Sequence, residues 1–199
     1  MKIEISKTES SHLLPAVRFV VSAAAKEETR YAINCVQINK NSLVATNGRR
    51  LHIAHMEHNW EPGLYEVVKK TKGKIVLIKS ETEATFPQWQ DIVPAHCNYF
   101  RSAYYGYGSD LWVDRNVGIL ARLGIGINSS NLVPLVEYGP RWNIYYGAFD
   151  QPLYAVSQGQ DDTIKCCAVI MPVDMGFDKF QTHRRIVSNI YVQPETDSR

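Results

Sequence analysis

The sequence lacks any run of apolar residues long enough to cross a membrane, and its first residues lack the apolar core of a signal peptide. Its four cysteines show no CxxC spacing, and two of them, Cys166 and Cys167, are adjacent, so neither a disulfide framework nor a zinc ribbon is indicated. We therefore expect a soluble cytoplasmic protein with reduced thiols and no membrane partner.

The sequence also has little net charge and none of the common enzyme motifs. Its 22 Lys and Arg residues against 20 Asp and Glu give a net charge of +2, which is too small to identify a nucleic-acid binder by bulk electrostatics. Neither a G-x-S-x-G motif, nor a phosphate-cradling glycine loop, nor a G-x-G-x-x-G pattern occurs. We therefore expect no cofactor and no catalytic residues.

Three histidines, His52, His55 and His58, leave one enzyme hypothesis open. Imidazole is a common zinc ligand. Side chains alternate along a strand, however, so His52 and His55 should point to opposite faces, and no nearby cysteine completes a ligand set. We predict no metal site, and an enzyme that uses this cluster remains the minority hypothesis.

The most informative stretch is residues 44–56, in which Asn47 and Gly48 separate two short apolar runs. Asn-Gly between such runs is among the strongest hairpin signals, because both residues tolerate the positive φ of a tight turn. Arg49 and Arg50 follow directly, although a turn needs no arginine. Their guanidinium groups could frame a pocket or carry an ion pair.

The first 56 residues predict a β-α-β-β-β unit. Ile3 and Ile5 alternate in a strand over residues 2–6, and a helix is expected within residues 10–25 because Ser10 can cap it and alanines end it. Three further strands are expected over residues 31–38, 43–46 and 50–56.

A second copy of this unit is indicated later in the chain. Residues 10–19 and 129–138 share the pattern S-S-x-L-apolar-P-x-V-x-aromatic. Alternating isoleucines, Ile125 and Ile127 in the second copy, precede each segment, and three strand-like runs follow, here at 142–146, 153–157 and 164–171. The matching order indicates an internal duplication.

The insert between the copies is too long to be one structureless loop. We expect a hairpin from residues 64–68 and 75–78 around a basic turn at 69–74, and a strand or short helix at 113–123. One more strand is expected at 186–192, before a polar tail.

Three segments, in order, resemble the bacterial sliding clamp, the β subunit of DNA polymerase III. Residues 30–38 and 44–51 resemble its Arg-x-x-Leu-Asn-Gly and Ala-Thr-Asp-Gly-x-Arg-Leu motifs. Residues 86–94 resemble its Phe-Pro-Asp-Tyr-x-x-x-x-Pro segment, and residues 168–173 resemble its Val-Met-Pro-Met ending. The chain departs at Asn47 for Asp, Ile33 for Leu and Cys35 for Gly.

The resemblance implies an α+β fold, a DNA-clamp-like domain over residues 1–175 in which two β-α-β-β-β units are related by pseudo-symmetry. Unit one is 1–56, the insert is 57–124, unit two is 125–175, and residues 176–199 form a C-terminal strand and tail. A clamp subunit of that family has three such domains in tandem. The resemblance therefore implies that this chain is a short form, of the kind we associate with phages and mobile elements.

The resemblance also implies a pocket for short linear peptides, with apolar walls for a Leu or Phe anchor. Alternatively, in a short form these residues could only pack the core. We expect alanine at Arg50 or Met171 to weaken peptide binding and leave the thermal midpoint nearly unchanged. Carried over by matching position, the pocket contains Arg30, Ile33, Thr46, Gly48, Arg49, Arg50, Leu51, Pro94, Val169 and Met171.

The family lines its ring with basic helices, and here Arg18 and Lys26 are the candidate DNA-binding residues. The resemblance thus implies a non-enzymatic replication accessory protein, a processivity factor that binds peptides of a DNA polymerase or other replication and repair proteins. It would assemble as a homo-oligomer around duplex DNA. The alternative is a regulatory decoy or inhibitor that engages host replication proteins without encircling DNA.

Overall fold

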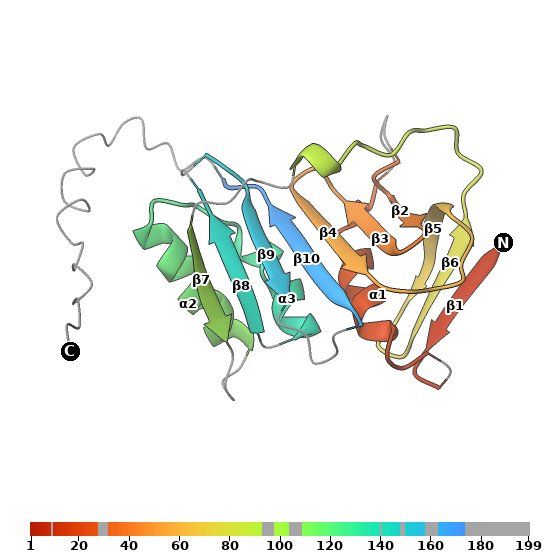
Figure 1. Ribbon diagram of the computed structural model, residues 1–199, viewed down its shortest axis with the longest axis horizontal. Helices are drawn as coiled ribbons and strands as arrows, with labels where there is room; N and C mark the ends of the chain where they lie inside the picture. Colours follow the sequence, from red (N-terminus) through yellow and green to blue (C-terminus); the bar gives the residue numbers. More distant parts are fainter. Residues whose placement is uncertain are drawn as a thin grey trace, which may run out of the picture.

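The computed structural model of the chain describes residues 1–8, 10–27, 32–92, 98–103, 109–139, 141–147, 150–157 and 163–173. Within these ranges, ten strands form one antiparallel sheet in the order β1-β6-β5-β2-β3-β4-β10-β9-β8-β7 (Figure 1). The strands are β1 (Lys2–Ser6), β2 (Cys35–Asn39), β3 (Ser42–Thr46), β4 (Arg50–His55), β5 (Gly63–Lys70), β6 (Lys74–Lys79), β7 (Asn98–Ala103), β8 (Arg141–Tyr146), β9 (Leu153–Ser157) and β10 (Lys165–Ile170).

The helices α1 (Leu14–Val21), α2 (Ser109–Arg122) and α3 (Val133–Tyr138) lie on one face of this sheet, behind it in Figure 1. Helix α1 begins with a proline in its first turn, where the missing N–H costs nothing, and it buries an apolar face that includes Val17 and Phe19. It ends at Val21, earlier than expected, and the following residues turn so that the amide of Ala25 donates to the carbonyl of Ile33.

The two halves of the sheet meet at the antiparallel pair of β4 and β10, where Ile53 lies opposite Cys167. Reading outward from this pair, the order β4-β3-β2 on one side matches β10-β9-β8 on the other. The hairpin β5–β6 is the extra element, inserted between β2 and β1. Phe19 of α1 and Tyr138 of α3, the aromatic residues that end the repeated motif, contact each other with ring centroids 5.3 Å apart.

The predicted hairpin of the insert is confirmed as β5 and β6. Of the strand or short helix expected at 113–123, residues 113–122 are helix, within the longer α2. The expected strand at Ile125 and Ile127 is wrong. Gly124, with a φ of 79°, ends α2, and the amide of Ile125 turns back to the carbonyl of Leu120. Both isoleucines are buried without forming a strand, and β7 supplies the outer strand of this half. The strand expected at 186–192 lies outside the described residues.

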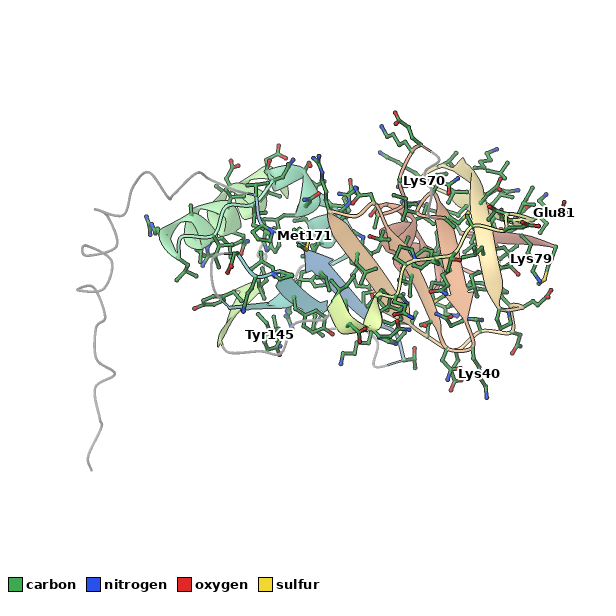
Figure 2. The ribbon with its side chains drawn as sticks, turned by 90° about the horizontal axis from the view of Figure 1, so that it is seen from above. Lys40, Lys70, Lys79, Glu81, Tyr145 and Met171 are labelled. Atoms are coloured by element: carbon green, nitrogen blue, oxygen red, sulfur yellow. The ribbon has the colours of Figure 1, made fainter. Side chains whose placement is uncertain are left out.

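Two apolar cores flank the sheet. The larger core lies between the sheet and the helices. A smaller one lies on the opposite, open face, where the segment that follows β6 crosses the sheet and forms the short 3-10 helix η1 (Gln90–Ile92) (Figure 2). This second core consists of Val44, Leu51, Ile53, Phe86, Cys167 and Val169, with Trp89 packed against it. In the described part of the chain, no helix has the length and apolar character needed to cross a membrane.

Candidate functional site

The turn between β3 and β4 is held rigidly by its own side chains. The Asn47 carboxamide oxygen accepts hydrogen bonds from the amides of Arg49 and Arg50, each 3.0 Å long. The Thr46 hydroxyl donates to the carbonyl of Arg50 at 2.8 Å and accepts from the amide of Gly48 at 3.1 Å. Gly48 has a φ of 80°, which favours glycine. The turn is therefore a fixed platform.

The end of β10 joins this platform, although it lies far away in the sequence. Val169 is the register partner of Leu51, and the amide of Met171 donates to the carbonyl of Arg49 at 2.9 Å. Thr46 lies opposite Leu51 on the other side of β4. Ile33 is half-buried just before β2, and its carbonyl accepts from the amide of Ala25. Six of the predicted pocket residues therefore meet at one end of the sheet: Thr46, Gly48, Arg49, Leu51, Val169 and Met171.

Strand alternation divides this group between the two faces. Leu51 and Val169 point to the open face, where they are only 3% and 1% exposed because Phe86 and Trp89 pack there. The Trp89 indole N–H donates to the Gln37 side chain at 3.2 Å. Accessible apolar surface at this end of the sheet comes from Met171, which is 39% exposed, and Val173.

Arg50 points to the helix face, away from Leu51. Its guanidinium donates to the carbonyl of Ser22, at the end of α1, at 2.5 Å, and to the carbonyl of Ser130 at 3.2 Å. Ser130 belongs to the 3-10 helix η2 (Ser129–Asn131), which leads into α3. Burial lowers the pKa of Arg50. The contacts tie β4 to both halves of the helix layer, so the expectation that Arg50→Ala leaves stability unchanged is not supported by them.

Two predicted residues, Arg30 and Pro94, lie outside the described residues. Two residues that the sequence does not assign to the pocket, Phe86 and Trp89, pack on the open face beside Leu51. The signal was present, since both aromatics stand in the segment 86–94 that resembles the clamp motif. The sequence alone does not predict the face of the sheet on which these two aromatic residues lie.

His52 is a structural residue of the helix-side core. It is fully buried, and its ring stacks on Phe19 with centroids 4.1 Å apart. Its Nδ1 lies 2.7 Å from the Phe19 carbonyl oxygen, which can only accept, so Nδ1 carries the proton. Burial lowers its pKa to about 3. His58 instead stacks on Trp60, and no group of three potential metal ligands occurs within the described ranges.

The two candidate DNA-binding residues occupy different places. Arg18 lies on α1, and its guanidinium donates to the carbonyls of Thr71, at 2.9 Å, and Lys72 in the turn between β5 and β6. Lys26 is exposed beyond the end of α1 and is therefore not part of the helix. The docked turn brings Lys70 and Lys72 to the helix side, where Lys70 interacts with Glu137 and Arg18.

Comparison with solved structures decides what this fold is. The β subunit of DNA polymerase III from Thermotoga maritima matches with a TM-score of 0.58 and 14% identity, over 88% of this chain and 66% of that chain. The sliding clamp from Pseudomonas aeruginosa matches with a TM-score of 0.58 and 11% identity, over 88% of this chain and 67% of that chain. The chain has a sliding-clamp fold.

A third clamp, the DNA polymerase III β subunit from Borrelia burgdorferi, was solved in complex with a natural product. It matches with a TM-score of 0.56 and 15% identity, over 88% of this chain and 63% of that one. The chain thus spans about two thirds of the length of the clamps it matches. No protein-family model and no curated protein matches its sequence. The identities to these clamps are 11–15%, and the match in structure confirms the fold that the order of the three motifs predicts.

Proposed function

We propose that the chain is a non-enzymatic, clamp-like accessory protein of DNA replication that binds short linear peptides of a DNA polymerase or another replication or repair protein. One observation carries this proposal: in a clamp fold, the turn at residues 46–51 meets the end of β10, with Met171 bonded to Arg49 and Val169 opposite Leu51.

The proposed peptide site is the sheet end around this junction. Met171 and Val173 offer exposed apolar surface to a Leu or Phe anchor, while the exposed Gly48 and Arg49 would meet polar groups of the peptide and the buried Thr46 would hold the turn. Burial of one large apolar anchor contributes about 1.5–3 kcal/mol, which suits a weak and exchangeable contact. Leu51 and Val169, covered by Phe86 and Trp89, would support the site from beneath, and Arg50 would hold the turn in place. Ile33, Arg30 and Pro94 enter the proposal by matching position.

The DNA-binding part of the proposal rests on the helix face. We propose that copies of the chain assemble around duplex DNA with this face inward, where Arg18 and the lysines of the β5–β6 turn would meet phosphates and Lys26 would extend the basic surface. The terminal strands of the described sheet, β1 and β7, each pair with a strand on one side only, so each leaves an edge at which another copy could add.

Light scattering coupled to size-exclusion chromatography, with and without nicked circular duplex DNA, tests the assembly. We expect an oligomer that stays on the nicked circle and slides off after the circle is linearised. A monomer that ignores circular DNA would contradict the ring. If that monomer still bound the peptide, the decoy alternative would replace the clamp-like function.

A further inference from the structure

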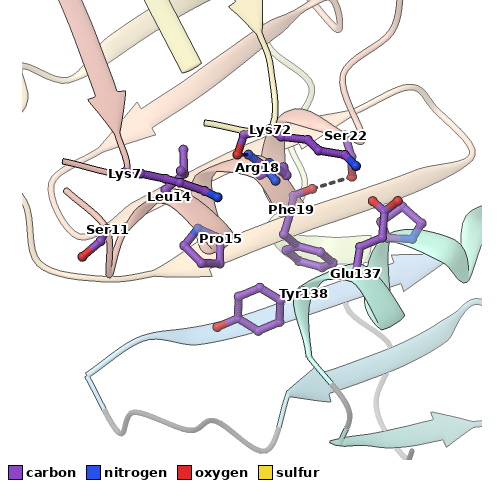
Figure 3. A pocket seen from close by; sticks show the side chains of 11 residues that line it. Lys7, Ser11, Leu14, Pro15, Arg18, Phe19, Ser22, Lys72, Glu137 and Tyr138 are labelled. Atoms are coloured by element: carbon purple, nitrogen blue, oxygen red, sulfur yellow. Dashed lines mark hydrogen bonds between the residues drawn. The ribbon is translucent and has the colours of Figure 1, made fainter. Parts of the chain in front are cut away.

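A cleft of about 420 Å³ lies on the helix face between α1, α3 and the turn of β5–β6 (Figure 3). Its lining combines two kinds of surface, a rim of cations and a floor of apolar rings, and it lies on the opposite face of the sheet from Leu51 and Val169. The lining residues that matter here are Lys7, Pro15, Arg18, Lys72, Glu137 and Tyr138.

The cationic rim is built before any ligand arrives. Arg18 donates to the carbonyls of Thr71 and Lys72, and the amide of Lys7 donates to the carbonyl of Gly73 at 3.1 Å. These bonds dock the turn on α1 and on the end of β1, which sets Lys7 and Lys72 along one rim. Among the described residues, the ion pairs use other lysines, Lys2, Lys74 and Lys79. The rim therefore keeps its positive charge available for an anion.

The floor consists of side-chain rings that the core supports. Pro15 is exposed at the start of α1, and the half-buried ring of Tyr138 comes from the end of α3 (Figure 3). The Tyr138 ring packs against Phe19, and it meets Trp142 edge-on with centroids 5.8 Å apart. A side chain braced in this way loses little freedom when a planar group settles on it. Glu137, exposed on the same helix, also lines the cleft and lies close enough to the β5–β6 turn to interact with Lys70.

We propose that this cleft binds one unpaired nucleotide of single-stranded DNA, with backbone phosphates against Lys7 and Lys72 and the base against Pro15 and Tyr138. The basic rim alone would bind the phosphates of a duplex as well as those of a single strand. An apolar floor gains nothing from a duplex, whose bases are already stacked and paired, whereas an exposed base gains by stacking on it.

This proposal goes beyond duplex encirclement and does not depend on the peptide site. Sequence reasoning could not reach it, because the sequence shows no interleaving of aromatic and basic residues. The fold creates that arrangement by placing Tyr138 beside Pro15 and docking the lysine-bearing turn next to them.

Fluorescence anisotropy with a labelled 12-nucleotide single strand and the matching blunt duplex tests the proposal. We expect the strand to bind more tightly than the duplex. Tyr138→Ala should weaken strand binding about 5- to 150-fold with little change for the duplex, because only the strand loses base stacking. Lys72→Gln should weaken both and lower the salt slope for the strand by about 0.7.

Tyr138 also packs against core residues, so Pro15→Ala serves as a second floor variant that leaves those contacts in place, with its thermal midpoint checked. Lys40→Gln is the matched control for charge, since Lys40 is exposed in the β2–β3 turn, away from the helices (Figure 2). Equal affinity for strand and duplex, unchanged by Pro15→Ala, would overturn the proposal. That result would leave the ring and the peptide site to their own tests.

Discussion

Arg50 shows that neighbouring residues of a short motif on a strand point to opposite faces of the sheet. In the sequence it stands between Arg49 and Leu51, and matching position assigns all three to one pocket. In the structure the Arg50 guanidinium reaches the carbonyls of Ser22 and Ser130 on the helix side, while Leu51 joins the core on the open face. Matching a strand residue to a family motif therefore predicts its place along the strand, but it does not predict which groups its side chain contacts.

Arg50→Ala should lower the free energy of unfolding by about 1–3 kcal/mol, because two hydrogen bonds from a charged donor are lost and the Ser22 carbonyl is left without that partner. Arg49→Ala is the matched control, since Arg49 is exposed and its side chain should contribute less than about 0.5 kcal/mol. Urea unfolding monitored by circular dichroism measures both. Equal stability of the two variants would show that the Arg50 contacts do not contribute to the free energy of unfolding.

His52 makes stability depend on pH. The folded chain holds it neutral because burial lowers its pKa to about 3, and the positive charges of Arg50 and Lys70 act in the same direction. In the unfolded chain a histidine titrates near pH 6.5, so between these values the unfolded state binds more protons and the free energy of unfolding falls as the pH drops. From this residue we expect a loss of about 2 kcal/mol between pH 7.5 and 5.

The variant His52→Phe isolates this contribution, because phenylalanine can keep the stack on Phe19 but cannot bind a proton. Urea unfolding at both pH values should show a smaller loss for the variant than for the unchanged chain. The same pH dependence in both proteins would contradict the account of His52, and would point to His55 or His58, whose pKa values are also lowered by burial.

At the scale of elements, hydrophobic periodicity placed β3, β4 and β8 to β10 within a few residues, because each strand carries a run of apolar or β-branched residues between turn residues. It failed at Ile125 and Ile127, where the alternation came from burial under the helices. It also failed to find β7, which lies at the start of a Tyr- and Gly-rich stretch. The order of segments could be predicted, but the pairing of β7 with β8 depends on contacts across the sheet.

The junction of β4 and β10 gives an element-scale prediction. If the halves form one sheet, the amides of β4 and β10 lie in its centre and should exchange hydrogen more slowly than those of the edge strand β1. Hydrogen exchange followed by mass spectrometry measures this. Fast exchange of the β4 amides that face β10, at the rate of β1, would mean that the two halves are separate.

At the scale of the whole molecule, the order of three weak motifs was enough to predict a clamp fold and to bring the end of β10 to the β3–β4 turn. It could not predict that Phe86 and Trp89 would cover Leu51 and Val169, because this depends on where the crossing segment settles on the sheet. The accessible part of the proposed peptide site is therefore displaced toward Met171 and Val173.

The central claim is that this sheet end binds peptides, and a binding titration of a fluorescent peptide with a Leu or Phe anchor tests it most directly. We expect the unchanged chain to bind, and Met171→Ala to weaken binding about fivefold, or roughly 1 kcal/mol, because an exposed apolar contact is lost. Val68→Ala, at an exposed apolar residue of β5, is the matched control and should bind normally. No binding by the unchanged chain, or equal binding by both variants, would contradict the claim.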